Sequence, residues 1–165
     1  MIRIAIDGPG GAGKSTIAKL VGNELGLEYI DTGAMYRAIG LKLNREGIAP
    51  EDVKSIHDIL EKTSIDFIDG KIILDGDDIS DVIRTQEISK LASTYSQITD
   101  VRSKLVDLQR KIAEGKGVIM DGRDIGTNVL ANAELKIFLT ADPMVRARRR
   151  FDELMAKGVE AVLDD

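Results

Sequence analysis

The sequence predicts an α/β fold in which helices flank a central parallel sheet, with a small antiparallel patch inserted into the chain. Short β-branched runs alternate with stretches of helical periodicity, as in chains built from βαβ units. Two Asp-Gly pairs, at 69–70 and 75–76, follow short β runs, which is a strong hairpin signal. The length of 165 residues suits one compact domain.

The N-terminal part of the chain opens a βαβ unit. Residues 2–6 form a β-branched run that we interpret as a buried strand, and residues 28–30 form a short second strand. Between them a helical period begins at Lys14 and ends at Gly26. The buried face of this helix is predicted to consist of four apolar residues: Ile17, Leu20, Val21 and Leu25.

The middle of the chain is predicted to be mostly helical, with a hairpin between the helices. Pro50 suits the first turn of one helix, where Glu51 and Asp52 would complement the helix dipole. The hairpin indicates an insertion rather than a part of the main sheet. The other elements expected here are helices over 34–45, 86–95 and 100–113 and hairpin strands over 64–67 and 71–74.

The C-terminal third returns to the alternating pattern. Residues 118–121 and 135–139 are predicted as two more buried strands. Asp142 caps a last helix and Pro143 occupies its first turn, and the helix is expected to end near Gly158.

Composition narrows the function classes. The net charge is −5 and no long basic run interrupts it, so we expect neither nucleic acid nor a membrane as a partner. The absence of cysteine excludes disulfides and cysteine nucleophiles and suits a reducing compartment. The apolar runs are shorter than the ~20 residues of a membrane span, and the N-terminus lacks the layout of a signal peptide. We therefore expect a cytoplasmic monomer.

A glycine-rich motif between the first strand and the first helix predicts a phosphate-binding loop. It matches G-x-x-x-x-G-K-[ST] at every fixed position, which a connector with a chance Lys-Ser pair would not be expected to do. Glycines let successive backbone N–H groups point at phosphate oxygens, Lys14 reaches the β- and γ-phosphates, and the Ser15 hydroxyl ligates Mg²⁺. The residues expected to bind ATP here are Gly8, Pro9, Gly10, Gly11, Ala12, Gly13, Lys14, Ser15 and Thr16.

Three further polar clusters are candidates for reading the acceptor. Residues 31–37 place a Thr-Gly turn at a helix start with an arginine one turn inside, which suits a phosphate. Residues 92–95, together with Arg102, form the second cluster. Residues 121–124 follow a core strand at its carboxyl end, where open α/β sheets bind ligands.

With these motifs the chain resembles the bacterial cytidylate kinase family over essentially its whole length. The resemblance rests on GPGGAGKST, DTGAMYR, ASTYSQITDVRSKLVDLQR and DGRDIGT, in this order, and on the β-rich stretch 64–74, which is similar to the family's monophosphate-binding insertion. It implies a P-loop kinase fold and phosphoryl transfer from ATP-Mg²⁺ to CMP or dCMP. It also implies a CMP site made of Thr32, Arg37, Ser93, Arg102, Arg123 and Asp124.

Within that site, the resemblance implies that Arg37 and Arg123 hold the acceptor phosphate. It implies that Ser93, Arg102 and Asp124 read the cytosine. The chemistry of the base agrees, because a carboxylate suits the C4 amino donor of cytosine and Arg and Ser suit its acceptors. Uracil would turn a carbonyl toward the Asp124 carboxylate, which should cost a few kcal/mol.

The proposed chemistry needs no side-chain nucleophile, because the acceptor phosphate attacks the γ-phosphate directly. Catalysis would consist of positioning and charge neutralisation by Lys14, Arg37 and Arg123. Asp121 is expected near Mg²⁺ together with Ser15, although a strand-end aspartate can also satisfy only backbone groups.

Other residues were assigned smaller roles or none. Arg146 and Arg150 share a helix face and are expected to contact ATP, the alternative being a solvated face. Tyr36 and Tyr95 are interpreted as packing residues. His57 is given no catalytic role.

The domain division follows from the motifs. Residues 1–32 and 112–144 are assigned to the P-loop core, 33–111 to the monophosphate-binding insertion, and 145–165 to a helix leading into an incomplete lid. The resemblance implies that the rest of the lid, a last core strand and a closing helix are missing from this chain. We therefore expect slower turnover than in a longer relative.

Two other functions remain compatible with these residues. One is a P-loop kinase for another small acceptor, such as shikimate or a different nucleotide. The other is a non-catalytic ATP-binding fragment. Release of ADP across a panel of acceptors distinguishes them.

Overall fold

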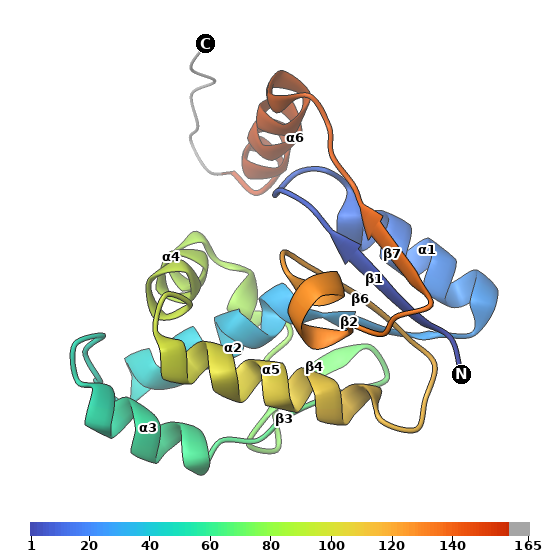
Figure 1. Ribbon diagram of the computed structural model, residues 1–165. Helices are drawn as coiled ribbons and strands as arrows, with labels where there is room; N and C mark the ends of the chain where they lie inside the picture. The colour runs from blue at the N-terminus through green and yellow to red at the C-terminus, as the bar shows by residue number, and fades with distance from the viewer. Residues whose placement is uncertain (159–165) are drawn as a thin grey trace.

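A four-stranded parallel sheet forms the centre of the protein in a computed structural model that describes residues 1–158 (Figure 1). The strand order is β2-β6-β1-β7, and all three pairings are parallel. The sheet confirms the predicted α/β class and the four predicted strands. The strands span Arg3–Asp7 (β1), Glu28–Asp31 (β2), Val118–Gly122 (β6) and Leu135–Phe138 (β7).

Alternating side chains cover both faces of this sheet. Ile4, Ile6 and Ile119 face α1 (Lys14–Leu25) and are almost fully buried. Ala5 and Met120 face the opposite side and join the larger core. That side is covered by α2 (Thr32–Arg45), by α5 (Thr99–Ala113) and by the π-helical turn η2 (Ile125–Val129), which the sequence did not predict.

The predicted buried face of α1 is wrong. Ile17, Leu20 and Leu25 are 42%, 58% and 54% exposed, and Val21 is only partly buried. The helix instead buries Ala18 and Gly22 against the sheet. A Cβ on Gly22 would lie 3.2 Å from Ile119 Cγ2 and 3.1 Å from the Leu27 carbonyl oxygen, so the close approach of α1 admits only small residues there. The sequence pattern predicts the wrong side of the helix because the prediction was based on large apolar side chains, whereas the buried residues are small.

The antiparallel patch is present and larger than predicted. Strands β3 (Ile65–Ile68) and β4 (Lys71–Leu74) form the expected hairpin, and a short β5 (Asp77–Asp78) adds a third strand. Asp69 and Asp75 both have φ of 51°, and the glycine after each is also at positive φ. Both Asp-Gly pairs therefore adopt the conformation that tight hairpin turns require.

Helix α3 (Val53–Glu61) packs against α5, and helix α4 (Gln86–Tyr95) packs against α2. The prediction for Pro50 is wrong, because α3 begins only at Val53 and Pro50 lies in the preceding turn. Asp52 is the N-cap of α3, and its carboxylate accepts a hydrogen bond from the Ser55 N–H (3.1 Å). A capping side chain satisfies an orphan donor of the helix start directly, which a proline at that place does not.

Two tyrosines pack as predicted. Tyr95 is 4% exposed, and its hydroxyl donates to the carbonyl of Ile48. Tyr36 packs against the main core, and burial raises the pKa of its hydroxyl. In the chain, a short 3₁₀ turn η1 (Val82–Arg84) connects the antiparallel patch to α4.

The last described helix, α6 (Pro143–Ala156), lies above the sheet near the loop that joins β1 to α1 (Figure 1). Asp142 caps it by accepting from the Met144 N–H (2.9 Å), as the sequence predicted. Of the domain predicted over 145–165, the last seven residues lie outside the described part. No helix in the described part is long and apolar enough to cross a membrane.

Candidate functional site

The glycine-rich loop joins the end of β1 to the start of α1, as its sequence context predicted. Gly8, Gly11 and Gly13 all have positive φ. A Cβ on Gly8 would lie 1.9 Å from the Leu139 carbonyl oxygen, so only glycine allows the loop to leave β1 in this direction. No side chain caps α1, which leaves the backbone N–H groups at its start to bind an anion.

Lys14 lies close to residues from two of the predicted polar clusters, residues 31–37 and 121–124. Its ammonium group donates to the carbonyl of Pro9 (2.9 Å). Partial burial lowers the pKa of Lys14, and the charges that act on it most belong to Asp121, Arg123, Asp31 and Asp7. Asp7 and Arg123, which are 116 positions apart in the sequence, both act on this one ammonium group.

Asp121 is a buried carboxylate at the end of β6, where it pairs in register with Asp31 of β2. The Tyr29 hydroxyl donates to its Oδ1 (3.1 Å). Burial, and next the neighbouring Asp31 charge, raise the pKa of Asp121 to about 6, against the lowering effects of the Tyr29 hydrogen bond and of Lys14. At neutral pH this site therefore holds two carboxylates whose repulsion a cation would relieve.

This raised pKa predicts a pH-dependent gain in stability for Asp121→Asn. The folded state binds the Asp121 proton more tightly than the unfolded state, so the free energy of unfolding falls as pH rises from about 4 to about 6. Removing the charge should stabilise the metal-free protein by about 2 kcal/mol at pH 7.5, and by much less at about pH 4.5. Urea unfolding in chelator at both pH values measures this; an equal difference at both would contradict it.

Asp31 and Arg37 form the second part of the site. The guanidinium of Arg37 contacts Asp31 Oδ2 (3.1 Å), while Asp31 Oδ1 caps α2 through the Ala34 N–H (2.9 Å). Arg37 Nε is buried and has no partner among residues 1–158. The Thr32 hydroxyl donates to the Asp121 carbonyl (2.7 Å), so in this state it joins β6 to the start of α2.

Arg123 and Asp124 form the third part. An Arg123 guanidinium nitrogen lies 3.6 Å from where a Gly10 Cβ would be, so Arg123 lies against the glycine-rich loop. Asp124 Oδ2 pairs with Arg102 (3.2 Å) and also accepts from Asn128 Nδ2 (3.0 Å). Asn128 was missed by sequence reasoning, although its spacing of four residues from Asp124 places the two side by side on a helical turn.

Ser93 is less clearly connected to this group. Its side chain is exposed on α4, and within the described residues its hydroxyl makes no hydrogen bond to Arg102 or Asp124. Its carbonyl accepts from the Ser96 hydroxyl (2.9 Å). Tyr36 does lie near the Arg102–Asp124 pair, since the charges of both act on its hydroxyl.

Helix α6 brings arginines to the other side of the loop. Arg146 contacts the Gly10 carbonyl (3.4 Å) and Arg149 contacts the Gly11 carbonyl (3.2 Å). Arg150, which we had paired with Arg146, instead contacts Glu153 (3.3 Å) in an exposed pair. Arg149 was missed, although positions three apart on a helix share a face as well as positions four apart.

Two cavities were found in the described part of the protein, and one of them lies beside Asp31 and Arg37. A cleft of about 520 Å³ lies between β2, the start of α2 and the β3–β4 hairpin, and Tyr29, Asp31, Arg37 and Phe67 contribute to its lining. A larger cavity, of about 700 Å³, lies around Arg110 and away from the loop. Only the smaller of these two cavities is lined by residues of the candidate site, Asp31 and Arg37.

Comparison with known proteins identifies the relatives of this chain. A family profile described as "Cytidylate kinase" matches residues 4–165. A protein of Caldicellulosiruptor bescii named cytidylate kinase is 56% identical over 163 residues, which are 96% of this chain and 72% of that protein. Proteins of the same name from Caldanaerobacter subterraneus and Clostridium acetobutylicum are 54% and 50% identical, each over 99% of this chain and over 73% and 76% of their own length.

Proposed function

Because this chain belongs to the cytidylate kinase family, we propose that it transfers the γ-phosphoryl group of ATP to CMP or dCMP, giving ADP and CDP or dCDP. The observation that carries the proposal is the meeting of Asp121, Arg123 and Asp31 around Lys14 at the glycine-rich loop. Such an arrangement suits two anionic nucleotides that meet end to end.

On the donor side, the loop and the start of α1 supply backbone N–H groups for the ATP phosphates. Lys14 moves from the Pro9 carbonyl to the β- and γ-phosphates. Arg146 and Arg149 contact loop carbonyls, and from there both would turn to the phosphates of bound ATP. Arg149 rather than Arg150 is thus the partner that the geometry favours for Arg146.

On the acceptor side, Arg37 and Arg123 hold the phosphate of CMP. Arg37 Nε is buried and lacks a partner within residues 1–158, so a phosphate oxygen could satisfy it. The cytosine is read by the pair Arg102 and Asp124, with Ser93 at the edge of the base site and the Tyr36 hydroxyl near the pair.

The oxygen ligands that Mg²⁺ requires are present. Ser15 is exposed at the start of α1 and Asp121 is anionic at neutral pH, and Mg²⁺ normally takes few protein ligands with phosphates and water completing its shell. When bound with ATP, Mg²⁺ would neutralise charge on the phosphates. The described residues contain no group of three or more carboxylate or histidine side chains that could hold a metal without the nucleotide.

The proposal extends to the division of the chain into a core, an insertion and the start of a lid. Residues 33–111 act as the acceptor-binding insertion on the P-loop core, and α6 acts as the entrance to a lid above the loop. Closure of both over the nucleotides would exclude water, which otherwise hydrolyses ATP. The protein acts as a cytoplasmic monomer, with ATP and CMP or dCMP as its partners.

A panel of acceptors tests the proposed function. Coupled ADP release is measured with ATP-Mg²⁺ and CMP, dCMP, UMP, AMP or shikimate, beside a longer relative as the positive control. Release that depends on CMP and dCMP supports the proposal. Release with another acceptor alone, or ATP binding without acceptor-dependent release, contradicts it and favours the other kinases or the non-catalytic fragment.

Asp124→Asn should reduce the preference for CMP over UMP. The carboxylate accepts from the C4 amino group of cytosine and repels the C4 carbonyl of uracil, whereas an amide can serve either. We expect the ratio of kcat/KM for CMP to that for UMP to fall by about 10-fold to 100-fold. Steady-state kinetics with both acceptors measures the ratio, and an unchanged ratio would remove Asp124 from base recognition.

A further inference from the structure

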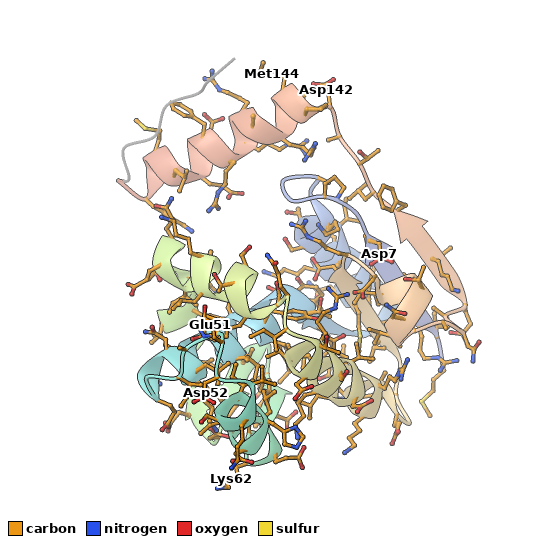
Figure 2. All side chains as sticks on the ribbon, turned by 60° about the vertical axis from the view of Figure 1, so that its left-hand side comes forward. Asp7, Glu51, Asp52, Lys62, Asp142 and Met144 are labelled. Atoms are coloured by element: carbon orange, nitrogen blue, oxygen red, sulfur yellow. The ribbon has the colours of Figure 1, made fainter. Side chains whose placement is uncertain are left out.

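The carboxylate of Asp7 has a set of contacts that the functions assigned so far do not use. Asp7 is the last residue of β1, immediately before the glycine-rich loop. Its Oδ1 accepts from the Ile125 N–H (2.8 Å) and its Oδ2 from the Gly126 N–H (2.8 Å). Asp7 is labelled in Figure 2.

These two hydrogen bonds join the donor loop to the acceptor residues. Ile125 and Gly126 directly follow Arg123 and Asp124, and both are buried, so they have little freedom to move. The Asp7 carbonyl in turn accepts from the Leu139 N–H (2.7 Å), at the end of β7. Asp7 therefore connects three segments: the glycine-rich loop, the turn at Arg123–Asp124 and strand β7, which leads to α6.

Each of the two carboxylate oxygens accepts one of these N–H groups, which an amide side chain with its single oxygen could not do. Hydrogen bonds from backbone N–H groups to an ionised acceptor are about twice as strong as neutral ones. The two N–H groups lie at the start of η2, where the first helical donors have no partner within the turn. No other side-chain acceptor for them is found in the described part of the chain.

We propose that Asp7 is a positioning residue for phosphoryl transfer, which sets the distance between the glycine-rich loop and the Arg123–Asp124 turn. This inference rests on the proposed function. A displacement of reacting groups by about 1 Å can cost about 100-fold in rate, so a tie between the two halves of the site has direct kinetic consequences.

Asp7→Asn tests this with the smallest change of shape. An amide can accept from one of the two N–H groups but presents its own N–H₂ to the other, so one bond is lost and two donors face each other. We expect kcat to fall by about 10-fold to 100-fold and KM for CMP to rise, with KM for ATP changed by less than about twofold. The ratio of CMP to UMP turnover should fall too, because Asp124 shares the turn.

A second variant perturbs the same contact from the other side. A Cβ on Gly126 would lie 3.3 Å from Asp7 Oδ2, so Gly126→Ala should push the carboxylate by a few tenths of an ångström. Its effect should have the same pattern as that of Asp7→Asn and be smaller. Two variants with one kinetic signature are not expected from a loss of folding alone.

Asp52→Asn is the matched control. Asp52 also accepts from a backbone N–H, at the start of α3, and Figure 2 shows it well away from Asp7. It should lower the melting temperature slightly and leave kcat and both KM values unchanged. Amide hydrogen exchange at Ile125 and Gly126, followed by NMR, should be faster in Asp7→Asn and unchanged in Asp52→Asn.

The outcomes separate the two proposals. A wild-type chain without CMP-dependent ADP release contradicts the proposed function, and the amide exchange still shows whether Asp7 holds the turn. With an active wild type, variants at Asp7 and Gly126 that melt lower but keep wild-type kinetics, or that lose ATP and CMP affinity equally, overturn the positioning role.

Discussion

Replacement of Lys14 by Met is expected to lower kcat with CMP by about 10³-fold and to leave the protein folded. The ammonium group lies in the loop amid Asp121, Arg123 and Asp31, where it would neutralise charge on the transferred group. Because partial burial lowers the pKa of Lys14, the folded protein gains little from its charge, and a neutral side chain should not reduce the free energy of unfolding. Single-turnover ADP release and thermal melting of both proteins measure the two effects.

Lys111→Met is the control for this variant. Lys111 is exposed in the last turn of α5 and lines neither of the two cavities. The same loss of a positive charge there should leave kcat within about twofold, since an exposed charge contributes little. Equal losses in the two variants would mean that net charge, rather than the position of Lys14, determines the rate.

Replacement of Arg123 by Ala should cost about 10²-fold to 10³-fold in kcat/KM for CMP. Its guanidinium lies beside Gly10 of the glycine-rich loop and acts on Lys14. Under the proposed function it would hold the acceptor phosphate next to that loop. Its side chain is exposed, and so the stability of the protein should not change. Arg123→Lys should recover only part of the rate, because an ammonium group cannot form the bidentate contact of a guanidinium with a phosphate.

Kinetics with varied CMP, at saturating ATP, measure these effects. Arg45→Ala, at the exposed C-terminal end of α2, is the matched control and should behave like the wild type. Full activity of Arg123→Ala would exclude Arg123 from the acceptor site. Full recovery in Arg123→Lys would show that charge alone is needed there.

Local signals were sufficient where structure depends on neighbouring residues. The two Asp-Gly turns, the glycine-rich loop and the capping role of Asp142 were all predicted, because turn and cap chemistry acts within a few positions of the chain. The prediction for Pro50 was wrong because two local signals competed, and the Asp52 side chain set the helix start.

Packing was harder to predict because it depends on how closely elements approach. The large apolar residues of α1 suggested a buried face, yet α1 buries Gly22 and leaves Leu20 exposed, since only small residues fit beside β6. Likewise, the sequence indicated arginines on α6 near ATP, but whether Arg149 or Arg150 joins Arg146 depends on the angle at which α6 crosses the loop.

The sequence by itself determined which chemical groups this protein carries: a glycine-rich loop with Lys14, two arginines that we propose for an acceptor phosphate and a carboxylate that we propose for a base. Only the tertiary structure decided how these groups meet, as when Asp7 reaches amides 118 and 119 positions away. The physical reason is the strand order, which sets β1 beside β6 and β2 on the other side of β6, so that the carboxyl ends of distant segments share one edge. The strand order cannot be predicted from the spacing of residues along the chain. It is fixed by the parallel pairing of the buried strands.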